Sequence, residues 1–216
     1  MIEAVVFDLD GVLIQTEEIW DEVRGDYIGR LGGRYDEEAQ RAMMGMSSKE
    51  WSVYIAEDLG VPRTAEQVNG DVVELMAASY REHLPLIDGA VEAVERMAAR
   101  WPLGVASSSN RPLIDLVLDL SGLVPLFRAT VSSEEVARGK PAPGVYLEAC
   151  RRLGADPTHA VAIEDSHAGI GSAKAAGMRV IAIPNPAFPP GDEALATADL
   201  VLNSLAELDQ GAVEGS

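Results

Sequence analysis

"VVFDLDGVL", residues 5–13, is an apolar run that leads directly into two aspartates, Asp8 and Asp10. Two carboxylates this close together repel each other, and burying them is costly unless a positive charge compensates. Because Asp and Gly are also common turn residues, this stretch alone is consistent with a strand that simply ends in a turn. The rest of the chain decides whether the two aspartates belong to a turn or to a site.

The remainder of the chain divides into two regions with different sequence patterns. From about residue 16 to 83 the segments are mostly polar and helix-like, and Thr16, Asp36, Ser47 and Thr64 are the expected N-caps. After residue 89, strand-like and helix-like segments alternate, which is typical of a parallel sheet covered by helices on both faces. The expected strands are residues 3–7, 103–107, 128–132, 160–164, 178–183 and 198–202, and residues 209–216 are expected to form a frayed tail.

The first strand belongs with the later strands, although about 70 residues separate them. A loop of that length is uncommon in a compact domain, so the intervening segment is expected to form a helical unit of its own. We therefore predict an α/β fold, with a Rossmann-like three-layer core around a parallel sheet and an inserted all-helical cap domain. Residues 1–14 and 86–216 are assigned to the core, and residues 15–85 to the cap.

Polar side chains stand at the ends of four expected strands. They are Asp8 and Asp10 for the first strand, Ser107 and Ser108 for the second, Lys140 for the third, and Glu164 and Asp165 for the fourth. Open α/β sheets bind ligands outside the carboxyl ends of their strands, so folding is expected to gather these groups at one rim. This convergence favours a site over a simple turn.

The chemistry of these groups is mutually consistent. Carboxylate oxygens without a His or Cys cluster favour Mg²⁺ over zinc. A cation and a lysine would offset the repulsion between a carboxylate and a phosphate, which is about 1 kcal/mol at about 4 Å in water. Serine hydroxyls and free helix N–H groups suit phosphate oxygens, and Ser108 or Ser109 is expected to cap the following helix. Two carboxylates can then act as nucleophile and general acid/base.

The composition is that of a globular protein with a strongly acidic surface. The 216 residues are 47% hydrophobic and carry a formal net charge of −18. This charge argues against nucleic acid or an anionic membrane as the partner, and any anionic ligand requires local cations. The single cysteine, Cys150, excludes an intramolecular disulfide. No apolar run reaches membrane-spanning length and no leader-like segment precedes the first strand, so we expect a cytoplasmic protein.

Four stretches together resemble a known family. They are "DLDGVL" (8–13), "VASSSN" (105–110), "GKPAPGVYLEA" (139–149) and "AIEDSHAGIGSAKAAGM" (162–178). In this order they resemble the phosphatases of the haloacid dehalogenase superfamily. The resemblance is to the branch with an inserted helical cap, which includes β-phosphoglucomutase and phosphoglycolate phosphatase.

The resemblance implies a role for each residue at the strand ends. It implies that Asp8 is the phosphoryl-accepting nucleophile and a Mg²⁺ ligand, and that Asp10 is the general acid/base with its backbone carbonyl on the metal. Ser107, Ser108 and Lys140 would bind the phosphoryl group, with Lys140 neutralising charge on it and on the nucleophile. Asp165 would bind Mg²⁺ directly, and Glu164 through metal-bound water.

Departures from the family pattern narrow the reaction. Haloacid dehalogenases proper and phosphonate hydrolases lack the second aspartate, so Asp10 argues against both. β-Phosphoglucomutase carries a histidine in the region of Trp20, and an indole cannot replace an imidazole in proton transfer. Trp20, Gly45, Met46 and Ser47 are the candidates for substrate specificity in the cap, although packing of the cap core explains the apolar ones equally well.

We predict a Mg²⁺-dependent phosphatase that hydrolyses a small phosphomonoester, a sugar phosphate or a phosphorylated small acid, through an aspartyl-phosphate. The expected partner is a small phosphorylated metabolite, and the protein is expected to be a monomer or a small homo-oligomer. Two alternatives stay open: a sugar phosphomutase similar to β-phosphoglucomutase, and a non-catalytic binding module on the same fold.

Overall fold

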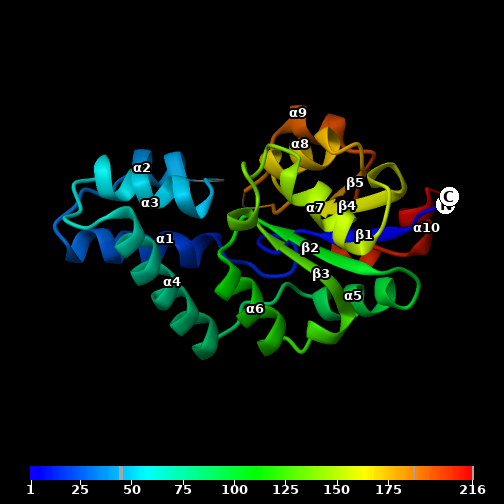
Figure 1. The fold of residues 1–216 in the computed structure, drawn as a ribbon, viewed down its shortest axis with the longest axis horizontal. Coiled ribbons are helices and arrows are strands. Elements are labelled where there is room, and N and C mark those ends of the chain that lie inside the picture. Colours follow the sequence, from blue (N-terminus) through cyan, green and yellow to red (C-terminus); the bar gives the residue numbers. More distant parts are fainter. Residues whose placement is uncertain (44–45, 187, 216) are drawn as a thin grey trace.

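Six parallel strands form one sheet in this computed structural model, which describes residues 1–43, 46–186 and 188–215. The strand order is β3-β2-β1-β4-β5-β6, so the first strand lies in the middle (Figure 1). The strands are β1 (Ala4–Phe7), β2 (Leu103–Ser107), β3 (Phe127–Ser132), β4 (Ala160–Glu164), β5 (Arg179–Ala182) and β6 (Leu200–Val201). Each lies within two residues of its predicted position, and the prediction of an α/β fold is confirmed.

Both faces of the sheet are buried. All four residues of β1 are fully covered; Val5 and Phe7 belong to one apolar cluster, and Ala4 and Val6 to the other. One face is covered by α5 (Ala90–Ala98), α6 (Arg111–Leu120) and α10 (Gln210–Glu214), and the other by α7 (Gly144–Leu153), α8 (His167–Ala175) and α9 (Asp192–Thr197). This arrangement explains why the strands are continuously apolar and not alternating.

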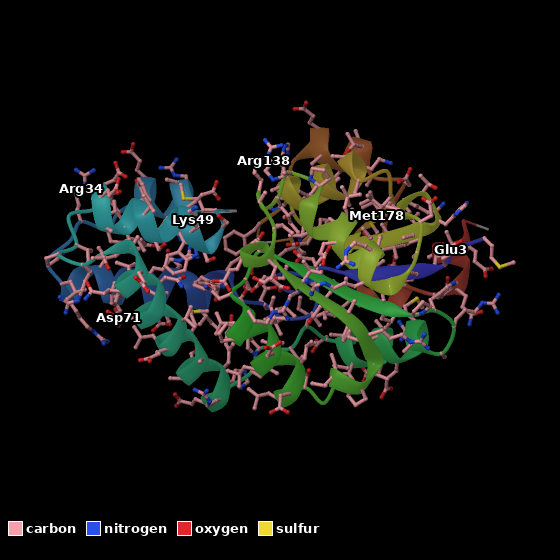
Figure 2. All side chains as sticks on the ribbon, in the orientation of Figure 1. Glu3, Arg34, Lys49, Asp71, Arg138 and Met178 are labelled. Carbon is pink, nitrogen blue, oxygen red and sulfur yellow. The ribbon has the colours of Figure 1, made fainter. Side chains whose placement is uncertain are left out.

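Four helices between β1 and α5 form a separate group at one end of the molecule (Figure 1). They are α1 (Glu17–Arg30), α2 (Glu37–Met43), α3 (Ser48–Glu57) and α4 (Ala65–Glu82). Reciprocal capping boxes begin α3, at Ser47, and α4, at Thr64. Figure 2 shows Arg34 and Asp71 in this group and Glu3 near the opposite end of the molecule.

The chain enters and leaves the helical group along two adjacent segments. The Gln15 N–H donates to the Pro85 carbonyl at 2.8 Å, and the Ile87 N–H donates to the Leu13 carbonyl at 3.0 Å. These contacts lie at the domain boundaries predicted from the sequence, at residues 14/15 and 85/86. The division into a core and a cap stays a prediction. Each helix of the described residues is too short or too polar to cross a lipid bilayer.

The prediction that residues 209–216 form a frayed tail is wrong. Residues Gln210–Glu214 form α10, and Asp209 caps it by accepting a hydrogen bond from the Ala212 N–H at 2.8 Å. The Val213 side chain is fully buried in the apolar cluster that also contains α5. With only Ala212 and Val213 apolar, this polar stretch gives no periodic signal, yet the buried Val213 anchors it.

Candidate active site

The carboxyl ends of β1 and β4 bring together three carboxylates and one lysine. In the register of these strands Phe7 is opposite Ile163, so Asp8 and Glu164 emerge side by side. The Lys140 Nζ lies 2.8 Å from Asp8 Oδ1 and 2.6 Å from Glu164 Oε1. A carboxylate oxygen from each of Asp8, Glu164 and Asp165 falls within 4.8 Å of the others, and all four side chains are buried.

This cluster sets three carboxyl groups against one lysine. Burial raises the pKa of Asp8 to about 8 against the opposing effect of Lys140, and the neighbouring Glu164 raises it further. Burial and the other carboxylates also raise the pKa of Asp165 well above its usual value. Burial alone would lower the pKa of Lys140, but Asp8 and Glu164 raise it, so the lysine stays charged. A further cation would relieve the remaining repulsion.

The residues present fit a hard divalent cation. Asp165 Oδ1 is buried and has no hydrogen-bond partner among the described residues. At Gly11, where φ is +83°, a Cβ atom would lie 2.0 Å from Asp165 Oδ2, so the glycine leaves this carboxylate its space. The ligand atoms on offer are carboxylate oxygens, which suit Mg²⁺ or Ca²⁺ better than softer metals.

Glu164 is held by donors of the protein. Its Oε1 accepts hydrogen bonds from Lys140 Nζ and from the Tyr146 hydroxyl, the latter at 2.7 Å. Its Oε2 accepts from the backbone N–H groups of Asp165 and Ser166 and from the Ser166 hydroxyl. Asp8 and Asp165 are therefore the carboxylates of the cluster with the least occupied oxygens. Glu164 fixes Lys140 in place beside Asp8.

Asp10 stands between the sheet and the first helix of the helical group. Thr16 Oγ1 donates to its Oδ1 at 2.7 Å, and Ser109 Oγ donates to its Oδ2 at 2.7 Å. Ser107 Oγ donates to the same Oδ2 at 3.3 Å. Hydroxyl groups from three different residues thus orient this carboxylate.

The serines after β2 have distinct environments. Ser107 is fully buried and accepts a hydrogen bond from the Ser109 N–H at 2.9 Å, whereas the half-buried Ser108 lines the cavity described below. The prediction that Ser108 or Ser109 caps the next helix is wrong, because Asn110 occupies the N-cap of α6. The Asn110 side chain instead donates to Asn69 of α4 at 3.0 Å, which ties the helical group to this rim.

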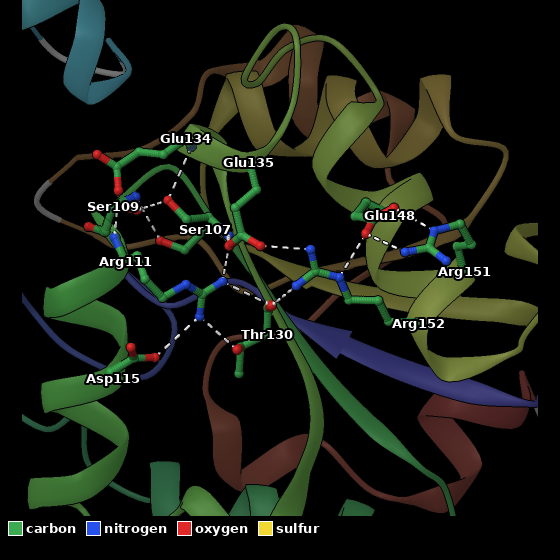
Figure 3. Close-up of polar contacts among 11 residues, drawn as sticks. Ser107, Ser109, Arg111, Asp115, Thr130, Glu134, Glu135, Glu148, Arg151 and Arg152 are labelled. Atoms are coloured by element: carbon green, nitrogen blue, oxygen red, sulfur yellow. Dashed lines mark hydrogen bonds and ion pairs between the residues drawn. The ribbon is translucent and has the colours of Figure 1, made fainter.

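A chain of ion pairs supports the loop that carries Lys140. Glu135, just after β3, pairs with Arg111 at the start of α6 and with Arg152 of α7 (Figure 3). The Thr130 side chain and carbonyl also accept hydrogen bonds from Arg111. Against the opposing effect of burial, the two arginines lower the pKa of Glu135 to about 2. This network engages the Arg111 guanidinium and anchors the loop at its beginning.

A cavity of about 310 Å³ lies above the carboxylate cluster. Asp8, Asp10, Lys140 and Asp165 line one side of it. Residues of the helical group line the other side, and Trp20, Arg24 and Met46 are among these residues. The predicted specificity residue Ser47 lines a different groove with Lys49 and Arg138, and Gly45 lies outside the described residues.

A family comparison matches most of the chain. Residues 5–183 match the profile of the haloacid dehalogenase-like hydrolases. The chain belongs to the haloacid dehalogenase-like hydrolase family. Hexitol phosphatase B of Escherichia coli (strain K12) is 35% identical over 213 residues, which cover 96% of this chain and 94% of that protein.

Two further relatives show how much of the chain is similar to known proteins. A bifunctional riboflavin kinase/FMN phosphatase of Arabidopsis thaliana is 32% identical over 94% of this chain, but the chain spans about half of that protein's length (54%). CbbY from Rhodobacter sphaeroides, crystallised in complex with phosphate, superposes with a TM-score of 0.88 at 28% identity. That superposition covers 99% of this chain and 100% of CbbY.

Sequence reasoning missed several residues of this hydrolase site. Thr16 was expected only as a helix N-cap, and its hydroxyl instead holds Asp10. Tyr146 lies within "GVYLEA", but its reach to Glu164 depends on how α7 packs against β1. Arg24 resembles any other charged residue of a polar helix. Its place in the cavity depends on the orientation of α1, for which the sequence carries no signal.

Proposed function

We propose that this chain is a Mg²⁺-dependent phosphatase that hydrolyses a small phosphomonoester through a phosphorylated Asp8. The observation that carries the proposal is the buried cluster of Asp8, Lys140, Glu164 and Asp165 on the floor of a cavity that the helical group covers. The family membership and the phosphatase names of the relatives support it. The substrate class is a phosphorylated sugar, sugar alcohol or small acid, consistent with the size of the cavity.

Asp8 and Asp165 would hold the ion, with the Asp10 backbone carbonyl as the further ligand that the family resemblance implies. The chemistry that a bound Mg²⁺ supplies is neutralisation of charge between the Asp8 carboxylate and the substrate's phosphoryl oxygens. Asp8 attacks the phosphorus atom through a carboxylate oxygen, and the bond to the leaving oxygen breaks. Lys140, fixed by Glu164, lies against Asp8 and balances charge there.

Asp10 is the proton carrier in this scheme. In its protonated form it gives its proton to the leaving alkoxide, and as a carboxylate it then takes a proton from the water that attacks the phosphorylated Asp8. The hydroxyls of Thr16, Ser107 and Ser109 hold its side chain in one orientation. The helical group limits the access of bulk water to the cavity and selects the substrate. We place this reaction in the cytoplasm.

The test is phosphate release from a panel of sugar, sugar-alcohol and small-acid phosphates, measured with Mg²⁺ and with a chelator. We expect release only with Mg²⁺, and we expect Asp8→Asn to abolish it. Asp26→Asn, on the exposed face of α1, is the matched control and is expected to retain full activity. Full activity in Asp8→Asn would refute the covalent mechanism.

Two other results would replace the proposal. Conversion of a hexose 1-phosphate to its 6-phosphate with little phosphate release would identify a mutase. Mg²⁺ binding without hydrolysis of any panel member would identify a binding module.

A further inference from the structure

Arg24 lies in the cavity against the rings of two neighbouring tryptophans. It lies on α1, one turn after Trp20, and its guanidinium carbon is 4.4 Å from the centre of the Trp20 ring and 5.1 Å from that of Trp51 on α3. The two rings themselves are 5.9 Å apart between centroids. Cation–π contacts with two rings hold the guanidinium in one position, so little side-chain freedom is left to lose on binding a ligand.

The Arg24 guanidinium has no ion-pair partner among the described residues. Within this part of the chain its Nε is buried without a hydrogen bond, and no carboxylate lies within 4 Å of its nitrogens. Burial lowers the pKa of Arg24 to about 10, against the opposing influence of Tyr35, Asp10 and Asp21. A desolvated cation without an ion pair is costly, and an anion that enters the cavity would remove that cost.

The neighbouring carboxylates are engaged elsewhere. Asp21 accepts a hydrogen bond from the Tyr35 hydroxyl, and Glu17 accepts one from the Gln15 side chain at 2.9 Å. Both carboxylates line the same cavity, and the Arg24 guanidinium beside the two indole rings is the positive charge that the helical group contributes to the described lining.

Lys140 cannot serve the far end of a substrate, because it is already paired with Asp8 and Glu164. The cavity therefore presents two cationic points with different tasks. Lys140 lies at the reacting end, and Arg24 lies on the helical side. A guanidinium offers a planar set of donors that matches a carboxylate or a phosphate with two parallel hydrogen bonds.

We propose that Arg24 selects substrates that carry a second anionic group, a carboxylate or a second phosphate, at the end remote from the reacting phosphate. This inference rests on the proposed function. It places phosphorylated acids and bisphosphates above neutral sugar-alcohol phosphates among the candidate substrates. The contrary expectation is that the acidic residues of α1 repel such a group and that Arg24 only binds hydroxyls.

The test compares kcat/KM for three probes: 2-phosphoglycolate, fructose 1,6-bisphosphate and glucitol 6-phosphate. We expect Arg24→Met to lower kcat/KM for a probe with a second anionic group, relative to the one without, by about 10-fold to 100-fold, in line with the loss of a charged hydrogen-bonded pair. Arg24→Lys keeps the charge without the paired donors, so its kcat/KM for these probes is expected to lie between the values of the wild type and of Arg24→Met. The first two probes distinguish a carboxylate from a second phosphate.

Arg30→Met is the matched control, since Arg30 lies on the exposed side of the same helix and pairs with Asp26. It is expected to leave all three values unchanged. An equal decrease for all three probes in Arg24→Met would overturn the inference, because it would indicate a structural role. Highest activity on glucitol 6-phosphate, with no change in preference in Arg24→Met, would overturn it as well.

A binding measurement separates this inference from the proposed function. If the wild-type protein releases no phosphate from any probe, the proposed function fails. Calorimetry of 2-phosphoglycolate and of fructose 1,6-bisphosphate with Asp8→Asn, with and without Arg24→Met, still tests Arg24. A tenfold or larger loss of affinity for either probe supports its role, and equal affinities for both probes in the two variants overturn it.

Discussion

Gly11 provides the space in which Asp165 lies. Its φ of +83° is the left-handed conformation that glycine adopts without cost, and any side chain here would collide with the Asp165 carboxylate. Gly32 has a similar φ of +79°, but nothing lies within 4 Å of where its Cβ would be. A comparison of substitutions at the two glycines therefore distinguishes the cost of backbone strain from the effect of a collision with Asp165.

We expect Gly11→Ala and Gly32→Ala each to lose about 1–2 kcal/mol of folding free energy, the cost of the left-handed conformation for alanine. Only Gly11→Ala is expected also to weaken Mg²⁺ binding, by about 10-fold to 100-fold, because Asp165 must move. Denaturant unfolding measures the first effect, and titration of activity or of heat with Mg²⁺ measures the second. Equal Mg²⁺ affinities in the two variants would contradict this account of Gly11.

The residues that the sequence could identify are those fixed by strand ends. Asp8, Glu164 and Asp165 adjoin buried strands, so the topology alone gathers them, and Lys140 follows β3 on a loop of limited reach. Arg24 could not be identified in this way, because a helix can present any of its faces to the cavity. The orientation of a helix depends on tertiary packing, which one sequence without relatives does not reveal.

The short C-terminal helix α10 is held to the rest of the molecule by few contacts. Val213 is buried against the cluster that contains α5, and the Arg179 side chain donates to the Ala212 carbonyl at 3.0 Å. Elements this short escape sequence analysis, because five residues contain too little of a helical period to detect. The longer strands and helices of the sheet region carry periodic or continuous apolar patterns, and for that reason their positions were predictable.

We expect Val213→Ala to lower the free energy of unfolding by about 2 kcal/mol, the cost of removing two buried methyl groups. Val124→Ala, at a valine that is 52% exposed, is the matched control and is expected to change it by less than about 0.5 kcal/mol. Urea unfolding measures both. A similar small loss in both variants would indicate that α10 frays in solution after all.

The buried carboxyl groups of the site affect the pH dependence of the stability of the whole molecule. The folded-state pKa of Asp8 is raised from 3.8 to about 8, chiefly by burial. A carboxyl group with a raised pKa contributes stability below its unfolded pKa of 3.8 and loses that contribution as the pH rises towards 8. A cation at the cluster reverses this cost, because it favours the ionised carboxylates.

We therefore expect the Tm of the metal-free protein to lose this contribution between about pH 4 and about pH 8. At a fixed concentration of about 100 times its Kd at pH 8, Mg²⁺ is expected to stabilise the fold at that pH by about 2.7 kcal/mol, or about 5–10 °C in Tm, and by less at pH 5. Differential scanning calorimetry with a chelator and with Mg²⁺ measures the difference. In Asp8→Asn the pH dependence of the increment is expected to shrink. A Mg²⁺ increment that is larger at pH 5 than at pH 8 would contradict the raised pKa of Asp8.

The central position of β1 has a consequence for synthesis on the ribosome. This strand emerges first, yet its neighbour β4 ends at Glu164, more than 150 residues later. At about 5–20 residues per second, the nascent strand waits on the order of 10 s for that partner. During this interval the edge of β1 that pairs with β4 is unpaired, and Lys140 and Glu164 have not formed their ion pair. A polypeptide released before Glu164 therefore has neither the complete sheet nor the ion pair between Lys140 and Glu164.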